Sequence, residues 1–64
     1  MADVVFKRVG DGKEVVVSTV AVTYVADATK RGMPPSTVIR LDGGQSVTVL
    51  GELAAVVSRL DGRG

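Results

Sequence analysis

The side chains best suited to binding a ligand gather in one short segment of the chain. Its nine residues include two cations, three hydroxyls and a glycine, namely Lys30, Arg31, Thr29, Ser36, Thr37 and Gly32. Arginine offers a planar fork to phosphate oxygens, lysine a mobile point charge, and glycine lets a ligand approach the backbone closely. The segment therefore predicts a phosphate site. The alternative is a solvated loop whose cations only keep the protein soluble.

Further candidates lie near this segment. Arg40, in the strand that leaves it, would point to the same place if it lies on the solvent face. Tyr24 can stack on a base at a subunit interface, or serve as an ordinary core or edge aromatic. Met33-Pro34-Pro35 is an apolar cap on a ligand or neighbouring subunit, or only a stiff connector. The predicted ligand-binding set is Tyr24, Lys30, Arg31, Gly32, Ser36, Thr37 and Arg40.

Catalytic residues are scarce in this sequence. With no His and no Cys, it has no Ser-His-Asp or Cys-His arrangement and no ordinary zinc or copper site. The aspartates fall at predicted turns and ends, where Asp is good turn chemistry: Asp3, Asp11, Asp27, Asp42 and Asp61. Gly10-x-Gly12 and Gly43-Gly44 each join two strands instead of opening a helix, unlike phosphate-binding fingerprints. We therefore expect no enzyme activity, cofactor or metal.

Length and charge restrict the function further. Sixty-four residues make one domain, residues 1–64, which buries only about 60% of the surface of its unfolded chain. Without disulfides or a metal, self-association is the remaining means of stabilisation, so we expect a homo-oligomer. Eight Lys and Arg against seven Asp and Glu make nucleic acid an unlikely partner. The apolar runs are short, such as Val15 to Val17, and there is no signal peptide, so we expect no membrane association and a cytoplasmic location.

Fourteen of the 64 residues in the chain are Val, and β-branched residues favour sheets. The first half of the chain is predicted to form strands. Residues 4–9 and 14–17 form a predicted hairpin around the turn Gly10-Asp11-Gly12-Lys13. The hydroxyls of Ser18 and Thr19 compete for backbone hydrogen bonds and predict a kink. A third strand then resumes at Val20 and runs to about Ala26.

The second half predicts a loop, a hairpin and a helix. Residues 27–36 hold both prolines and form the long loop, and residues 37–41 and 45–49 form a hairpin around Asp42-Gly43-Gly44. A helix over 51–61 is predicted to bury a stripe of Leu53, Val56, Val57 and Leu60, with Gly62 as its C-cap. The fold class is thus α+β: about five mainly antiparallel strands, as two hairpins plus a central strand, and one C-terminal amphipathic helix.

The string from Thr37 to Gly44 and on to Val49, followed by a helix carrying Leu53, Val56 and Leu60, resembles the flagellar FlbD-like proteins. That resemblance covers roughly Phe6 to Leu60 and implies the fold, not the flagellar role. The chain departs from the family at Ser18-Thr19 and by inserting residues 29–35. In size, lack of catalytic residues and expected oligomerisation, it is also similar to small phage anti-defence proteins that sequester nucleotide signals.

These observations leave two main hypotheses. The first is a homo-oligomeric binding protein that sequesters a phosphate-bearing small molecule, such as a nucleotide signal, between subunits through Lys30, Arg31 and Arg40. The second is a structural or adaptor protein that docks on a protein partner through an exposed strand edge or the terminal helix, where Ala54 and Ala55 allow close approach. A nucleic-acid binder is the third hypothesis and an enzyme the fourth.

Overall fold

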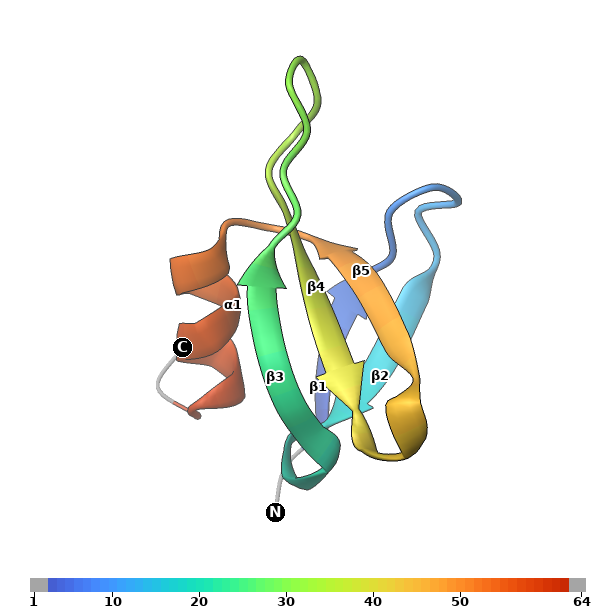
Figure 1. Ribbon diagram of the computed structural model, residues 1–64, viewed down its shortest axis with the longest axis vertical. Helices are drawn as coiled ribbons and strands as arrows, with labels where there is room; N and C mark the ends of the chain where they lie inside the picture. The colour runs from blue at the N-terminus through green and yellow to red at the C-terminus, as the bar shows by residue number, and fades with distance from the viewer. Residues whose placement is uncertain (1–2, 63–64) are drawn as a thin grey trace.

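Two antiparallel sheets and one C-terminal helix make up the structure, a computed structural model that describes residues 3–62 (Figure 1). The strands are β1 (Asp3–Lys7), β2 (Glu14–Ser18), β3 (Val22–Asp27), β4 (Ser36–Leu41) and β5 (Ser46–Leu50), and the helix is α1 (Leu53–Leu60). Short 3-10 turns occupy Thr19–Ala21 and Asp42–Gly44. The predicted α+β class is confirmed, with the five strands divided between a two-stranded and a three-stranded sheet.

The predicted first hairpin is confirmed. Strand β1 pairs with β2 in the register Phe6↔Val15, and the turn between them uses Gly10 and Gly12 at positive φ. Asp11 lies between these glycines and accepts a hydrogen bond at Oδ1 from the Lys13 backbone N–H at 3.0 Å. Asp11 therefore has the turn role that its position predicts.

The kink after β2 is a 3-10 turn, which corrects the predicted start of the third strand. Val22 donates its N–H to the carbonyl of Thr19, and β3 begins at Val22 and not at Val20. Ser18, the N-cap of this turn, makes no side-chain capping hydrogen bond, so the backbone bond from Val22 to Thr19 makes the kink. Val20 is left on the surface.

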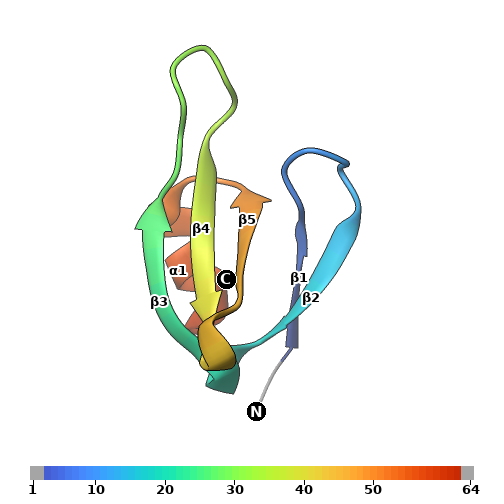
Figure 2. The same ribbon diagram turned by 45° about the vertical axis from the view of Figure 1, so that its right-hand side comes forward.

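The three-stranded sheet has the order β3-β4-β5, so the strand that is central in the sequence lies at an edge and β4 lies in the middle. The two sheets meet where Arg8 bridges to Val49 and the Val9 N–H donates to the Thr48 carbonyl at 2.9 Å. Figure 2 shows the β1–β2 hairpin beside β5 and α1 behind the three-stranded sheet. The opposite face of that sheet, called here the outer face, is covered by no other helix or strand of residues 3–62.

A small apolar core fills the space between the two sheets and α1. Its five buried members are Phe6, Val17, Ile39, Val49 and Val56. The helix contributes only one of them, because Val56 is 1% exposed whereas Val57 is 41% exposed. The prediction that Val57 is buried was therefore wrong: successive residues turn by about 100° around a helix, and Val57 projects away from the core.

The C-terminal helix is also joined to β1 by a polar contact. The Arg59 Nη2 donates to the Val5 carbonyl at 2.8 Å, and the guanidinium carbon lies 4.6 Å from the centroid of the Phe6 ring. Gly62, at a φ of 79°, donates its N–H to the Arg59 carbonyl. The predicted glycine C-cap is confirmed.

Candidate functional site

The loop of residues 28–35 stands away from the body of the protein and has a rigid base (Figure 1). Asp27 Oδ1 accepts hydrogen bonds from the Thr29 N–H at 3.1 Å and from the Thr29 hydroxyl at 2.7 Å. These bonds lower the pKa of Asp27 below its ordinary value. The Thr29 hydroxyl oxygen also accepts from the Ser36 N–H at 3.1 Å. Thr29 is therefore occupied in tying the two arms of the loop together.

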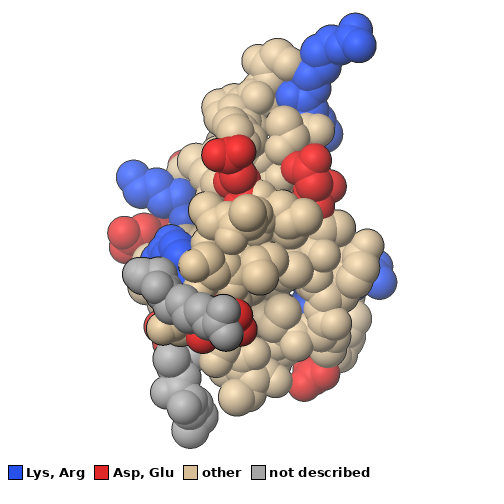
Figure 3. Space-filling view, turned by 90° about the vertical axis from the view of Figure 1, so that its left-hand side faces the viewer, with Lys and Arg blue, Asp and Glu red and all other residues tan. Residues whose placement is uncertain are grey.

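The tip of the loop presents the two predicted cations. Met33 donates its N–H to the Lys30 carbonyl at 3.0 Å, and Gly32 has a φ of 78°, the geometry of a type II turn with Arg31 at its first central position. Figure 3 shows basic side chains gathered at this tip. Neither Lys30 nor Arg31 forms an ion pair with any residue from 3 to 62. Both charges are available to an anion.

A groove of about 480 Å³ opens between this loop, the β1–β2 turn and the end of β5, and we call it the loop–turn groove. It is lined by Val9, Gly10, Ala28, Lys30, Met33, Pro34, Ser36, Thr48 and Leu50. Most of these side chains are apolar, and Lys30 is the one charged member. An apolar trough with a cation at its rim suits a ring system that carries a phosphate.

Thr37 does not belong to this groove. Its side chain is 0% exposed and lies on the core side of β4, where its hydroxyl donates to the Gly51 carbonyl at 2.9 Å. The strand alternation carries this signal, because Thr37 is two residues from the buried Ile39 and so faces the same side. The expected role of Thr37 at a ligand site therefore gives way to a structural one.

Arg40 and Tyr24 lie on the outer face, at the opposite end of the sheet from the loop. They are directly opposed in the register of β3 and β4, and Tyr24 is 56% exposed. Arg40 is four residues from Ser36, which is about 13 Å along a strand. The expectation that Arg40 would join Lys30 at one phosphate is corrected by this separation. With Thr37 in the core, the structure divides the rest of the predicted set between the loop and the far end of the outer face.

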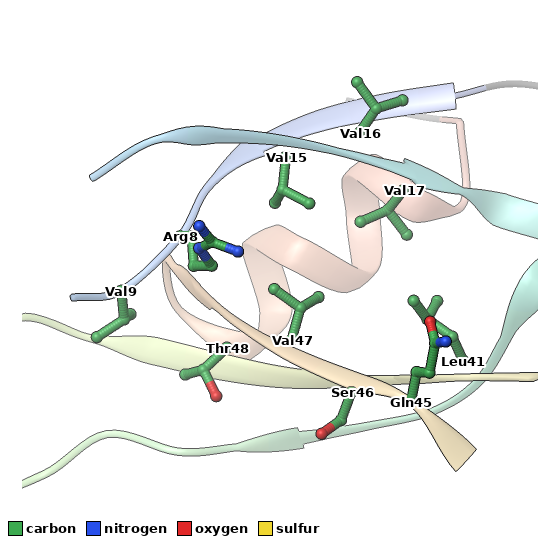
Figure 4. Close-up of a pocket in the computed structure, with 10 residues that line it drawn as sticks. All are labelled: Arg8, Val9, Val15, Val16, Val17, Leu41, Gln45, Ser46, Val47 and Thr48. Carbon is green, nitrogen blue, oxygen red and sulfur yellow. The ribbon is translucent and has the colours of Figure 1, made fainter. Parts of the chain in front are cut away.

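A second opening lies between β2 and β5, and we call it the seam (Figure 4). It has a volume of about 490 Å³, and its walls include Val15 and Val17 from β2 and Val47 from β5. Its cation, Arg8, is already paired with Asp11. That guanidinium lowers the pKa of Asp11 to about 2. The seam offers apolar contact and strand edges, but no unpaired charge.

Four residues of the loop–turn groove lie outside the loop, and sequence patterns did not identify them: Val9, Gly10, Thr48 and Leu50. They come from two segments far from the loop in sequence, and each has an ordinary reason to occur in a strand or a turn. No local signal distinguishes them, since long-range pairing brings them to the loop: β5 pairs with β4, and Arg8 bridges to Val49.

Comparison with protein-family models, curated proteins and solved structures finds no match to this chain. The FlbD-like resemblance therefore stays a prediction. Between residues 3 and 62, no helix has the length and apolar character needed to cross a bilayer.

Proposed function

We propose that this protein is a non-enzymatic binding module that sequesters a phosphate-bearing small molecule of the nucleotide type in the loop–turn groove. The observation that carries the proposal is the position of Lys30, an unpaired cation beside an apolar trough. Lys30 and Arg31 hold the phosphate, and the groove walls of Met33, Pro34 and Leu50 contact the base.

The sequence of the loop supports this role. A type II turn places the two cations on adjacent residues at the tip, while the Asp27–Thr29–Ser36 hydrogen bonds fix the loop base. A preorganised loop loses less conformational entropy when a ligand binds. Met33, which is 59% exposed, then gains burial against the base.

Homo-oligomerisation is part of the proposal. Ligand sites usually bury most of their ligand, whereas the groove residues Met33 and Leu50 are exposed, so a second copy would supply the missing cover. A core with five buried apolar side chains is also small, which favours stabilisation by association. The exposed Ala54, Ala55 and Val57 of α1 are a further surface for subunit contact.

Calorimetry with adenosine, inorganic phosphate and adenosine 5'-monophosphate tests the groove. We expect the nucleotide to bind more tightly than either part, and Lys30→Gln to weaken it about tenfold or more, because a charge-assisted hydrogen bond contributes about 1.5–3 kcal/mol. Lys13→Gln is the matched control, as it removes one exposed lysine from the β1–β2 turn. Sedimentation of the same samples reports whether two or more copies hold the ligand.

The groove proposal fails if no nucleotide releases heat, or if Lys30→Gln and Lys13→Gln behave alike. Its oligomeric part fails if the protein sediments as a monomer both with and without a saturating nucleotide. The two parts are thus separable by measurement.

The seam favours a second candidate function, that of an adaptor. Strand β2 pairs only with β1 among the described strands, so an extended peptide can add to the free edge of β2. The side chain of Val16, in the same strand, is exposed to solvent. Val16→Lys would block such a contact by placing a charge on that strand. Loss of a specific co-purifying protein in Val16→Lys, with nucleotide affinity unchanged, would favour the adaptor over the sequestration module.

A further inference from the structure

We infer that the ligand is a linear dinucleotide, with one nucleotide in the loop–turn groove and the second held by Tyr24 and Arg40 at the far end of the outer face. The inference rests on the proposed function and names the ligand class for that site. Tyr24 and Arg40 are adjacent across β3 and β4, and both side chains are exposed. They provide a ring and a cation side by side, which are the groups that a base and a phosphate require.

Arg40 differs from the arginines that have structural roles. The guanidinium of Arg8 is paired with Asp11, and that of Arg59 is bonded to the Val5 carbonyl. The guanidinium of Arg40 has no hydrogen bond or ion pair to any residue from 3 to 62. Likewise, no cation occupies the Tyr24 ring within those residues. Both groups are free to contact a ligand.

The surface between the two positions is uncharged and uncovered. The cross-strand row next to Tyr24 and Arg40 consists of Ala26, Val38 and Thr48, all without charge. Thr48 already borders the groove, as do Ser36 and Leu50 in the following row. The three-stranded sheet presents this face to the front in Figure 1, with β1, β2 and α1 behind it or at its edge. A ligand can therefore cross from the groove to Tyr24 along the sheet.

The separation selects the ligand class. About 13 Å of strand lies between Ser36 and Arg40, which is too far for one phosphate group to bridge. Two linked nucleotides span such a distance and match the order of groups along the face: trough and Lys30 at one end, ring and Arg40 at the other. The 64-residue chain is nearly neutral, with a formal net charge of +1, so it lacks the general positive field that favours a long nucleic-acid strand.

Fluorescence anisotropy and calorimetry with three ligands test the inference: adenosine 5'-monophosphate, the linear 5'-phosphorylated dinucleotide of adenosine, and the corresponding hexanucleotide. We expect the dinucleotide to bind about tenfold more tightly than the mononucleotide, as one extra stacked base predicts. Tyr24→Ser and Arg40→Gln should each remove that advantage and leave mononucleotide affinity unchanged. Tyr24→Phe, which keeps the ring, should retain it, and Lys30→Gln should weaken both ligands.

The outcomes separate this inference from the function on which it rests. Equal affinities for mono- and dinucleotide, with Lys30→Gln still weakening both, overturn only the two-point inference. The two-point inference is also overturned if Tyr24→Ser still binds the dinucleotide as much more tightly than the mononucleotide as the parent protein does. A hexanucleotide that binds more than tenfold tighter than the dinucleotide, with a steep salt dependence, also overturns it, because the ligand is then a nucleic-acid strand. If neither nucleotide binds, the proposed function itself fails.

Discussion

Arg59, in the last turn of α1, donates a hydrogen bond from Nη2 to the backbone carbonyl of Val5 in β1, 54 residues away in sequence. The same guanidinium lies over the Phe6 ring. This contact joins the last element of the chain to the first, across the core that both elements cover. In a domain with so few buried residues, one such contact is a substantial part of the stability.

We expect Arg59→Met to lower the free energy of unfolding by about 1–2 kcal/mol, because it removes a charged donor and a cation–π contact while keeping an apolar side chain of similar length. Chemical denaturation followed by circular dichroism measures the change. Arg40→Met is the control, because the Arg40 side chain has no hydrogen bond or ion pair to any residue from 3 to 62. This variant should change the free energy of unfolding by less than about 0.5 kcal/mol. Equal effects of the two substitutions would contradict the stabilising role of Arg59.

Val56 and Val57 are neighbours on α1 but differ in burial, so their alanine variants compare a buried and an exposed valine in the same helix. Val56→Ala should cost about 1.5–3 kcal/mol, because it leaves a cavity beside Ile39 and Val49 in the core. Val57→Ala should change the free energy of unfolding by less than about 0.5 kcal/mol, since that side chain is largely in solvent. Thermal and chemical unfolding of both variants measure the difference. A costly Val57→Ala would show that Val57 is covered in the protein in solution, as expected if α1 forms a subunit contact.

Removal of the Thr37 hydroxyl tests whether this side chain serves the core and not the ligand site. Thr37→Val keeps the shape of the side chain but removes the donor to the Gly51 carbonyl, so we expect a loss of about 1–2 kcal/mol in stability. Nucleotide affinity of the folded variant should remain that of the parent protein. Thr23→Val removes an exposed hydroxyl bonded to the Arg40 carbonyl at 3.3 Å and should have little effect. If the folded Thr37→Val variant bound nucleotide more weakly than the parent protein, Thr37 would contribute to the ligand site after all.

The Arg8–Asp11 pair predicts a pH dependence of the first hairpin. The pKa of Asp11 is lowered in the folded protein to about 2 from 3.8, so its stabilisation is present above pH 3.8 and is lost as the pH falls towards 2. An NMR titration of the side-chain carboxyl carbons reads this pKa directly. Arg8→Gln should return the pKa of Asp11 towards its ordinary value and leave that of Asp27 unchanged, because Thr29 lowers the latter. An unchanged pKa of Asp11 in Arg8→Gln would refute the pairing.

Several features of this protein follow from local sequence alone. Glycines at positive φ fix the turns around Asp11 and Gly43, alternating apolar residues define the strands, and the stripe through Val56 defines the helix. These signals act over a few residues, so the hairpins and the α+β class are predictable without any knowledge of distant contacts. The absence of His and Cys likewise means that this chain offers no imidazole or thiol side chain to a site.

The tertiary structure decided which of the predicted residues share a site. Lys30 and Arg40 are near each other in sequence, but β4 carries Arg40 away from the loop because each strand residue advances the chain by about 3.4 Å. Conversely, Leu50 meets the loop because β5 pairs with β4, and Val9 meets it because Arg8 bridges to Val49. The side chain of Thr37 was assigned to the site from its type, whereas the pleat of β4 turns it into the core. Local composition determines the elements, and long-range pairing determines which faces meet.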